Sequence, residues 1–222
     1  VEISSIQGGY SNAIKQLNKF IEVGYQDYAK YSSDPSKEAS SQLSPYFHSG
    51  QISTHEVFDK ISELESWSPE SINPKMVGRR EGWWGSSENF ESFMDELITW
   101  RELGYHTCVR RANYNQYSSL PEWAIKTLHE HSSDEREHIY SLDELTYSQT
   151  HDEIWNAAQN QLRTQGVIQN YLRMLWGKKI LEWTPNPQIA LSYMITLNDR
   201  YSLDGRDPNS YSGVFWILGR YD

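Results

Sequence analysis

The chain has 222 residues and a formal net charge of −10 at pH 7. Its length suffices for one large domain or two small ones, with a core that needs no disulfide or metal. The acidic balance argues against a surface that binds nucleic acid throughout, although a local basic groove can coexist with it. Aromatic residues make up 14% of the chain, so much of the buried area must come from rings.

The sequence gives no sign of a membrane or secreted protein. A single cysteine, Cys108, excludes an intramolecular disulfide and fits a reducing compartment. No apolar run approaches the roughly 18 residues of a membrane span. Residues 1–10 lack the basic and apolar regions of a signal peptide. We therefore expect an intracellular monomer, cytoplasmic or nuclear, and the ends of the sequence suggest an excised or partial chain.

Helical periodicity dominates the chain. Apolar residues recur at spacings of three, four and seven, and no stretch shows sustained strand alternation with hairpin turns. We predict one all-α domain over residues 1–222, with long polar loops at 32–40, 66–88 and 105–119. The predicted helices cover 10–30, 88–103, 151–166, 170–183 and 187–201.

Local signals predict where several helices begin. Ser53, Ser141 and Thr150 each precede a glutamate by three residues, which is the spacing of a capping box. Asn186 followed by Pro187 is a second kind of start, a cap residue before a proline in the first turn.

Two polar segments admit both a structural and a functional interpretation. Residues 39–53, "ASSQLSPYFHSGQIS", are either an ordinary helix start or a cradle for phosphate made of hydroxyls and backbone N–H groups. Residues 197–213, "LNDRYSLDGRDPNSYSG", are either a polar turn or a rim of acceptors for a ligand with several ring N–H groups. The acids there do not fit a calcium loop, and the histidines of 129–138 are better read as a solvated surface. No metal site is predicted.

The segment 170–183, "NYLRMLWGKKILEW", combines an apolar body with charges. Trp176 and Trp183 are seven residues apart, so they share a helix face and lie about 10.5 Å apart along the axis. A core role is the simpler interpretation of that pair. Arg173 points to the same side, and a buried arginine needs a partner. The acids of 199–207 are the candidates.

These segments together resemble the flavin-binding helical domain of class II DNA photolyases. The resemblance runs in order through "GGYSNAIKQLNKFI", "LSPYFHSGQIS", "DELITWREL", "THDEIWNAAQ", "YLRMLWGKKILEW" and "LNDRYSLDGRDPNSYSG". It implies an enzyme, a deoxyribodipyrimidine photolyase, that binds FAD and uses light to split cyclobutane pyrimidine dimers in damaged DNA. The family's N-terminal antenna domain and last stretch are absent here, and "RREGWWGSS" (79–87) matches no family pattern.

The resemblance also assigns roles to single residues. Arg173 and Asp204 would form an ion pair beside the flavin ring, which acts in its reduced anionic form, and Asn198 would face its N5 atom. Trp176, Trp155 and Trp183 would carry an electron from the surface to the photoexcited flavin. The remaining FAD contacts would come from Tyr28, Ser40, Ser41, Gln42, Leu43, Ser44, Phe93, Arg101 and Gly205.

On the DNA side, the resemblance implies that Glu96 and Met174 touch the thymine dimer. Trp100 and Trp216 would form aromatic walls around it. Lys178 and Lys179 would meet phosphate, as would Arg79, Arg80, Arg110 and Arg111, and for each a solvated surface charge is an equally good interpretation. Three other functions remain open: a cryptochrome-like photoreceptor, repair of the (6-4) photoproduct, and a folded but inert fragment.

Overall fold

The computed structural model describes residues 5–79 and 81–221. They form two compact units, one spanning Gln7–Glu102 and the other running from Leu103 onward together with Ser5 and Ile6. Within the described residues the secondary structure is helical and includes no strand, which confirms the all-α prediction. No described helix is long and apolar enough to cross a membrane.

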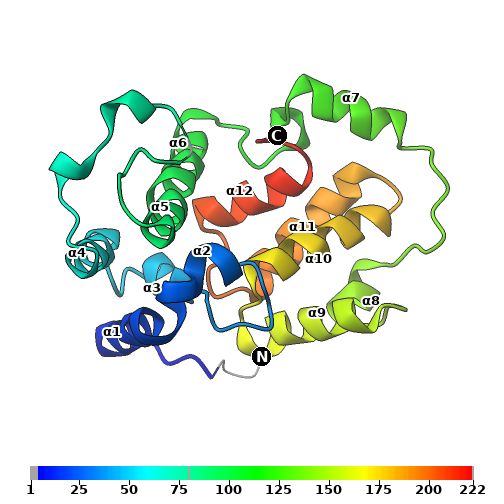
Figure 1. Cartoon of the computed structure of the whole chain (residues 1–222). Helices are drawn as coiled ribbons and strands as arrows, with labels where there is room; N and C mark the ends of the chain where they lie inside the picture. Colours follow the sequence, from blue (N-terminus) through cyan, green and yellow to red (C-terminus); the bar gives the residue numbers. More distant parts are fainter. Residues whose placement is uncertain (1–4, 80, 222) are drawn as a thin grey trace. The chain divides into compact units, whose positions relative to one another are not determined.

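The first unit consists of short helices joined by irregular helical turns (Figure 1). The predicted helix over 10–30 is one continuous helical path that changes type, with a π-helical turn at Phe20–Gly24. The predicted helix over 88–103 changes in the same way at Asp95–Trp100. Single π-helical turns inside α-helices are frequent at functional sites. The α-helices of this unit are α1 (Tyr10–Lys19), α2 (Tyr28–Tyr31), α3 (Ser44–His48), α4 (Thr54–Leu64) and α5 (Glu88–Met94).

Rings fill the core of the first unit, as the composition predicts. Phe20, Tyr28 and Phe93 pack with ring centroids 5.1–5.7 Å apart. A second group joins Trp67 to Trp84, whose backbone carbonyl accepts a hydrogen bond of 2.7 Å from the Trp67 indole. Aromatic pairs at these separations are worth about 0.5–1.5 kcal/mol each beyond the area that they bury.

The second unit is built around α10 (Asn170–Glu182), which contacts α9 (Glu153–Gln165), α11 (Pro187–Tyr201) and α12 (Pro208–Ile217) (Figure 1). Gly177 allows α12 to approach closely, because a Cβ there would lie 2.2 Å from Cδ1 of Ile217. The remaining helices are α6 (Arg101–Arg110), whose first two residues belong to the other unit, α7 (Glu122–Glu130) and α8 (Leu142–Thr146).

Most of the predicted helix starts are confirmed. Ser53 caps α4 through the backbone N–H of Glu56, Ser141 makes a complete capping box at α8, and the Asn186 side chain caps α11. The start at Thr150 is wrong. Asp152 caps α9 instead, by accepting a hydrogen bond of 2.9 Å from the backbone N–H of Trp155.

Helices extend into one predicted loop and into one stretch interpreted as a polar turn or an acceptor rim. α6 continues to Arg110, so the loop expected over 105–119 starts only after that residue. α12 begins at Pro208, inside the stretch read as a polar turn or an acceptor rim. Asp207 caps α12, and the Asp199 carboxylate accepts from the Arg206 backbone N–H and the Tyr211 hydroxyl. These acids therefore have structural partners.

Candidate functional site

Arg173 on α10 forms the predicted ion pair with Asp204, just beyond the end of α11. Its Nη1 lies 3.2 Å from the Asp204 carboxylate, and both side chains are largely buried, with 16% and 13% of their surface exposed. Ser202 completes the cluster, because its hydroxyl donates to Asp204 and accepts a 3.4 Å hydrogen bond from Arg173 Nη2. The ion pair supplies opposite charges, and the added hydrogen bonds of Ser202 fix the orientation of both side chains.

The turn that carries Asp204 is held by its neighbours. A Cβ on Gly205 would lie 2.8 Å from the carbonyl oxygen of Asn198, so only glycine lets the turn approach the end of α11. The Ser210 hydroxyl donates a 2.6 Å hydrogen bond to the Asp204 carbonyl. The position of the carboxylate therefore depends on backbone contacts as well as on Arg173.

Several buried polar atoms of this unit have no hydrogen-bond partner among the described atoms, and two of them are donors on residues of this candidate site. They are Nε of Arg173 and Nδ2 of Asn198, and Asn198 is only 2% exposed. An unmatched buried donor costs roughly 1–3 kcal/mol. Its presence here fits a ligand that presents acceptor atoms. The ring nitrogens and carbonyl oxygens of a flavin are acceptors of this kind, so these residues fit the cofactor that the sequence resemblance implies.

Trp176, Trp155 and Trp183 form a continuous row of buried indoles. Trp155 lies in the middle: its ring is parallel to that of Trp176 at 6.4 Å and tilted by 69° from that of Trp183 at 5.7 Å. The Trp155 indole donates to the backbone carbonyl of Trp176, and the Trp176 indole donates to Gln159. Trp176 and Trp183 were predicted to share a helix face, and the Trp155 ring from α9 contacts both of them.

The outer end of this row is covered. Trp183 is 2% exposed, so the row does not itself reach the surface, although the resemblance implies an electron path that starts there. Tyr140 and His151 pack against Trp183 at 5.6 and 5.1 Å, and they share a 2.7 Å hydrogen bond. Lys179 lies 5.5 Å from the centre of the Trp183 ring and pairs with Glu182.

In the first unit, residues 40–43 form an irregular stretch that leads into α3 at Ser44. The Ser41 carbonyl accepts a hydrogen bond of 2.9 Å from the Gln16 side chain, and Leu43 is fully buried. Gln42 adopts a left-handed backbone conformation, with φ of 53°. Such strain in a residue other than glycine clusters at ligand sites and is held by the surrounding contacts. The Ser40 and Ser41 side chains are half-buried, so their hydroxyls remain accessible to a ligand.

Tyr28 and Phe93 belong to the aromatic core of the first unit. Their rings make an edge-to-face contact at 5.2 Å, and both residues are buried. Burial raises the pKa of the Tyr28 hydroxyl, and the negative charges of Glu96 and Asp95 raise it further. Arg101 is half-buried and contacts Glu102 at 2.9 Å.

The candidate dimer-binding residues lie in both units. Glu96 and Trp100 share the π-helical turn at Asp95–Trp100, where the Trp100 indole donates to Asp95. Glu96 is exposed, which differs from the water-poor pocket that its implied role requires. In the second unit, Met174 and Trp216 are half-buried on α10 and α12.

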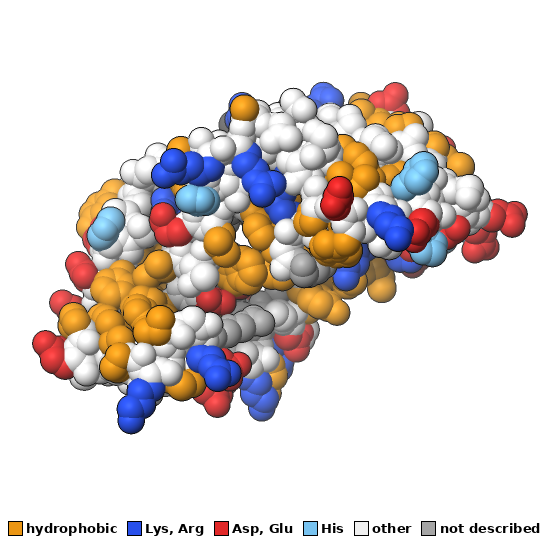
Figure 2. All heavy atoms as spheres, turned by 90° about the horizontal axis from the view of Figure 1, so that it is seen from above, with side chains coloured by type: hydrophobic (Ala, Val, Ile, Leu, Met, Phe, Trp, Pro, Cys, Tyr) orange, Lys and Arg blue, Asp and Glu red, His pale blue; other side chains and the backbone are white. Residues whose placement is uncertain are grey.

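The candidate phosphate contacts differ in their availability. Lys178 is exposed and Lys179 is engaged with Glu182. Arg111 donates to the Ser119 carbonyl, and Arg80 lies outside the described residues. Arg79 and Arg110 are exposed. Figure 2 shows basic and acidic side chains on the same face, with no continuous basic surface in that view.

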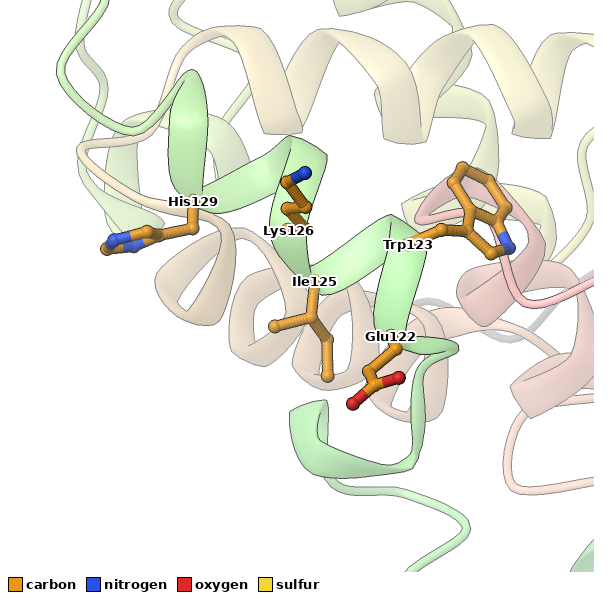
Figure 3. Close-up of a pocket in the computed structure, with 5 residues that line it drawn as sticks. All are labelled: Glu122, Trp123, Ile125, Lys126 and His129. Atoms are coloured by element: carbon orange, nitrogen blue, oxygen red, sulfur yellow. The ribbon is translucent and has the colours of Figure 1, made fainter.

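A surface hollow along α7 contains none of the predicted residues. It is lined by Glu122, Trp123, Ile125, Lys126 and His129. Figure 3 shows these side chains spreading away from the helix without converging on a point, which is unlike a site that would hold a small ligand.

Sequence reasoning missed Ser202, Gln159, Tyr140 and His151. Gln159 had a usable signal, because it follows Trp155 by four residues and must share its face of α9. The other three had none, since their contacts join segments that are distant in the sequence or depend on the turn before Asp204.

Comparison with known proteins finds relatives that are similar over the whole of this chain. The deoxyribodipyrimidine photo-lyase of Methanothermobacter thermautotrophicus is 40% identical over 222 residues, covering 100% of this chain and 45% of that protein. The chain spans less than half the length of the curated relatives that it matches over its whole length. Cryptochrome-2 of Arabidopsis thaliana is 52% identical over 50 residues, 22% of the chain. No family model matches.

Structural comparison supports the same fold. The crystal structure of a bacterial class III photolyase from Agrobacterium tumefaciens has a TM-score of 0.70 to this chain at 18% sequence identity. The match covers 97% of this chain and 39% of that protein. The likeness therefore extends over nearly all the helices described above.

Proposed function

This chain belongs to the photolyase family, and from that premise we propose that it is the FAD-binding part of an enzyme that splits cyclobutane pyrimidine dimers in DNA with light. The observation that carries the proposal is the buried row of Trp176, Trp155 and Trp183, with neighbouring ring centroids no more than 6.4 Å apart. Indoles are oxidisable, so such a row provides a stepwise path for an electron through an otherwise insulating core.

FAD supplies the light-driven electron transfer when it is bound, and the chain supplies position and charge. Arg173 would stabilise the anionic form of the flavin, and Asp204 limits the excess of positive charge there. Asn198 can present either its N–H or its carbonyl at the flavin N5 atom. Gly205 permits the turn that places Asp204.

In the first unit, the candidate FAD-binding residues lie in residues 40–44 and in the aromatic core. The hydroxyls and backbone N–H groups of 40–44 suit the phosphates and the ribityl chain. Gln42 and Leu43 contribute backbone to this stretch, and Ser44 begins α3. Tyr28, Phe93 and Arg101 would complete the same pocket, with the two rings fixed by their mutual contact.

The proposed enzyme would also bind the DNA lesion. Photolyases are established base flippers, and the poor stacking of a dimer lowers the cost of extruding it. Met174 and Glu96 would touch the dimer, with Trp100 and Trp216 as apolar walls. Once the lesion excludes water, Glu96 could hold a proton and donate a hydrogen bond to a thymine carbonyl. Lys178 would contact phosphate.

The direct test uses the purified chain, its absorption spectrum and an oligonucleotide that contains one thymine dimer. We expect a flavin spectrum and, after chemical reduction and illumination, recovery of intact thymines. A dark sample and an oligonucleotide with a (6-4) product are the matched controls. Absence of a bound flavin, or a bound flavin with no dimer splitting, would contradict the proposal.

The short cryptochrome match supports one rival, a flavin photoreceptor that uses the same indoles for signalling. In that case illumination would reduce the flavin while the dimer stayed intact. The half-buried Met174 and Trp216 favour repair, because a receptor has no need of a lesion-binding pocket.

A further inference from the structure

Gln159 is an unexpected residue in the core of the second unit. It lies on α9 with no exposed surface, and its side-chain oxygen accepts a 2.8 Å hydrogen bond from the Trp176 indole. An indole N–H can only donate, so the orientation of the Gln159 amide is fixed with its oxygen toward the ring. Its Nε2 has no partner among the described atoms.

Packing alone does not explain a glutamine at this position. Burying an amide with an unmatched N–H group is unfavourable; leucine or methionine would avoid that cost, but either would leave the buried Trp176 N–H without an acceptor. The part of Gln159 that has a partner is the oxygen that faces Trp176. Its contribution must therefore be sought in the chemistry of that indole.

The other ring of the parallel pair has a different partner. The Trp155 indole donates to the backbone carbonyl of Trp176 at 3.0 Å, an oxygen that is fixed by the helix. Trp176 is therefore the member of the pair whose N–H depends on a side chain. Its hydrogen bond can be changed by substitution without altering the backbone.

We propose that Gln159 is a positioning residue that keeps the indole proton on Trp176 while that ring is oxidised; this inference rests on the proposed light-driven function. In the proposed function, Trp176 would give one electron to the light-excited flavin and become a radical cation, whose N–H is a much stronger acid than that of the neutral indole. The Gln159 amide oxygen stabilises the positive charge through the hydrogen bond, but it is too weak a base to remove the proton.

Retention of the proton keeps the charge mobile. Trp155 then gives one electron to Trp176, which returns to a neutral indole with its proton still in place, and the positive charge moves to Trp155. No proton has to be returned before the next cycle. A basic side chain at position 159 would take the proton and leave a neutral radical trapped on Trp176.

The first arm of the test needs no flavin. In the chain labelled with ¹⁵N-tryptophan, the indole N–H resonance of Trp176 is assigned by its loss in Trp176→Phe. Gln159→Leu should move that resonance to the position of an unbonded indole. Gln161→Leu is the matched control, because Gln161 lies on the same helix and its side chain bonds to Gln165. If the chemical shift of the Trp176 indole N–H is unchanged in Gln159→Leu, the inference is overturned.

The second arm measures transient absorption and light-driven flavin reduction in the flavin-loaded chain. Gln159→Leu should lower the yield of reduction about fivefold, which corresponds to loss of about 1 kcal/mol, a typical net value for a hydrogen bond. Gln159→Glu keeps an acceptor oxygen, and its carboxylate should convert the tryptophan signal from a radical cation to a neutral radical.

The outcomes separate this inference from the proposed function. If the unmodified chain binds no flavin, the proposed function fails, while the resonance of Trp176 still reports whether Gln159 holds the indole. If flavin binds but both variants give the reduction yield and radical spectrum of the unmodified chain, the role of Gln159 is refuted and the proposed function stands. Should Gln159→Leu fail to fold, the radical spectrum of Gln159→Glu decides alone.

Discussion

At the scale of single residues, the chemistry depends on charges and donors that the fold holds in fixed directions. Arg173 contacts both Asp204 and Ser202, and it keeps one further donor unmatched. Its side chain therefore presents both a positive charge and an available N–H to a ligand. A mid-helix arginine among apolar residues predicted a partner among the acids of 199–207, and the resemblance identified Asp204 as that partner.

Replacing Arg173 by alanine should weaken flavin binding and abolish the stable reduced flavin. A hydrogen bond to a charged group is worth about 1.5–3 kcal/mol, so affinity should fall roughly tenfold to a hundredfold. A flavin fluorescence titration and anaerobic photoreduction measure the two effects. Arg200→Ala is the control, since Arg200 is exposed and lies over the Tyr201 ring. Unchanged affinity and photoreduction in Arg173→Ala would mean that the residue is structural.

Substitution of Trp176 by phenylalanine should block light-driven flavin reduction while leaving dimer repair by chemically reduced flavin intact. Phenylalanine keeps an apolar ring at the centre of α10 but is far harder to oxidise. The measurement is the rate of flavin reduction under constant illumination with an external reductant. Trp123→Phe serves as the control, because Trp123 is half exposed on α7. Reduction at the original rate in Trp176→Phe would contradict the electron path.

At the scale of helices, close approach decides how the second unit packs. A Cβ on Gly177 would lie 2.2 Å from Ile217 Cδ1 and 3.0 Å from the sulfur of Met194. The first contact is far inside the van der Waals distance, so the Ile217 side chain or the helix that carries it would have to shift. Gly213 on α12 differs, since a Cβ there would meet only the methyl carbon of Met174, at 3.5 Å.

This contrast predicts opposite effects of the same substitution. Gly177→Ala should destabilise the chain by about 1–3 kcal/mol through overpacking. Gly213→Ala should be neutral or stabilising by up to about 1 kcal/mol, because alanine is the better helix former and the space is open. Urea unfolding followed by circular dichroism gives both values. Equal effects of the two substitutions would show that helix propensity, not close packing, sets the outcome.

A carboxylate links three elements of the first unit. Glu65, at the end of α4, accepts hydrogen bonds of 2.8 Å from the Tyr25 hydroxyl and from Ser87, the cap of α5. Burial raises the pKa of Tyr25, and the hydrogen bond to Glu65 raises it further. The stabilising contribution of this hydroxyl is therefore complete below the unfolded pKa of about 10. It is lost as pH rises toward the higher pKa of the folded state.

Stability should consequently fall as pH rises above about 10, and Tyr25→Phe should reduce that fall. At pH 7 the same substitution should cost about 1.5–3 kcal/mol, the usual value of a hydrogen bond to a charged group. Thermal unfolding between pH 7 and 11 provides the measurement. Tyr171→Phe is the control because Tyr171 is half exposed on α10. A slope that is the same in Tyr25→Phe as in the unmodified chain would contradict this coupling.

The sequence predicted elements better than their internal geometry. Periodicity located the helices, and hydroxyl or amide side chains located three of their starts. The π-helical turns at Phe20–Gly24 and Asp95–Trp100 had no local signal, since they preserve the helical spacing of apolar residues. α12 was hidden because its aromatic and small residues follow an Asp-Gly turn. Asp207 with Pro208 marks its start by the same rule that identified Asn186 with Pro187.

At the scale of the whole molecule, net charge and function point in different directions. A chain with a formal charge of −10 repels phosphate on average, so DNA must meet local cations. Composition alone therefore argued against nucleic acid, whereas the order of motifs pointed to DNA repair. The candidate roles followed from that resemblance. Ser202 and Gln159 emerged only when the folded chain placed them against Arg173 and Trp176.

Binding of a dimer-containing oligonucleotide should weaken steeply as salt rises from 50 to 200 mM, since each neutralised phosphate releases counterions. Lys178→Gln should weaken binding and reduce the slope of log affinity against log salt by about 1. The control is Lys126→Gln on α7, where the lysine pairs with Glu130 at 3.8 Å. Fluorescence anisotropy measures both slopes. Identical slopes in the two variants would exclude Lys178 as a phosphate contact.

The hydrogen bond from the Trp155 indole to the Trp176 carbonyl joins two helices as well as two rings. The same hydrogen bond therefore lies on the proposed electron path and in the contact between α9 and α10. Warming that loosens α9 from α10 would widen the gap between the parallel rings while each helix stayed intact. The rate of light-driven flavin reduction should then decline at a temperature below the melting of the helices. That rate would therefore report how closely α9 and α10 pack.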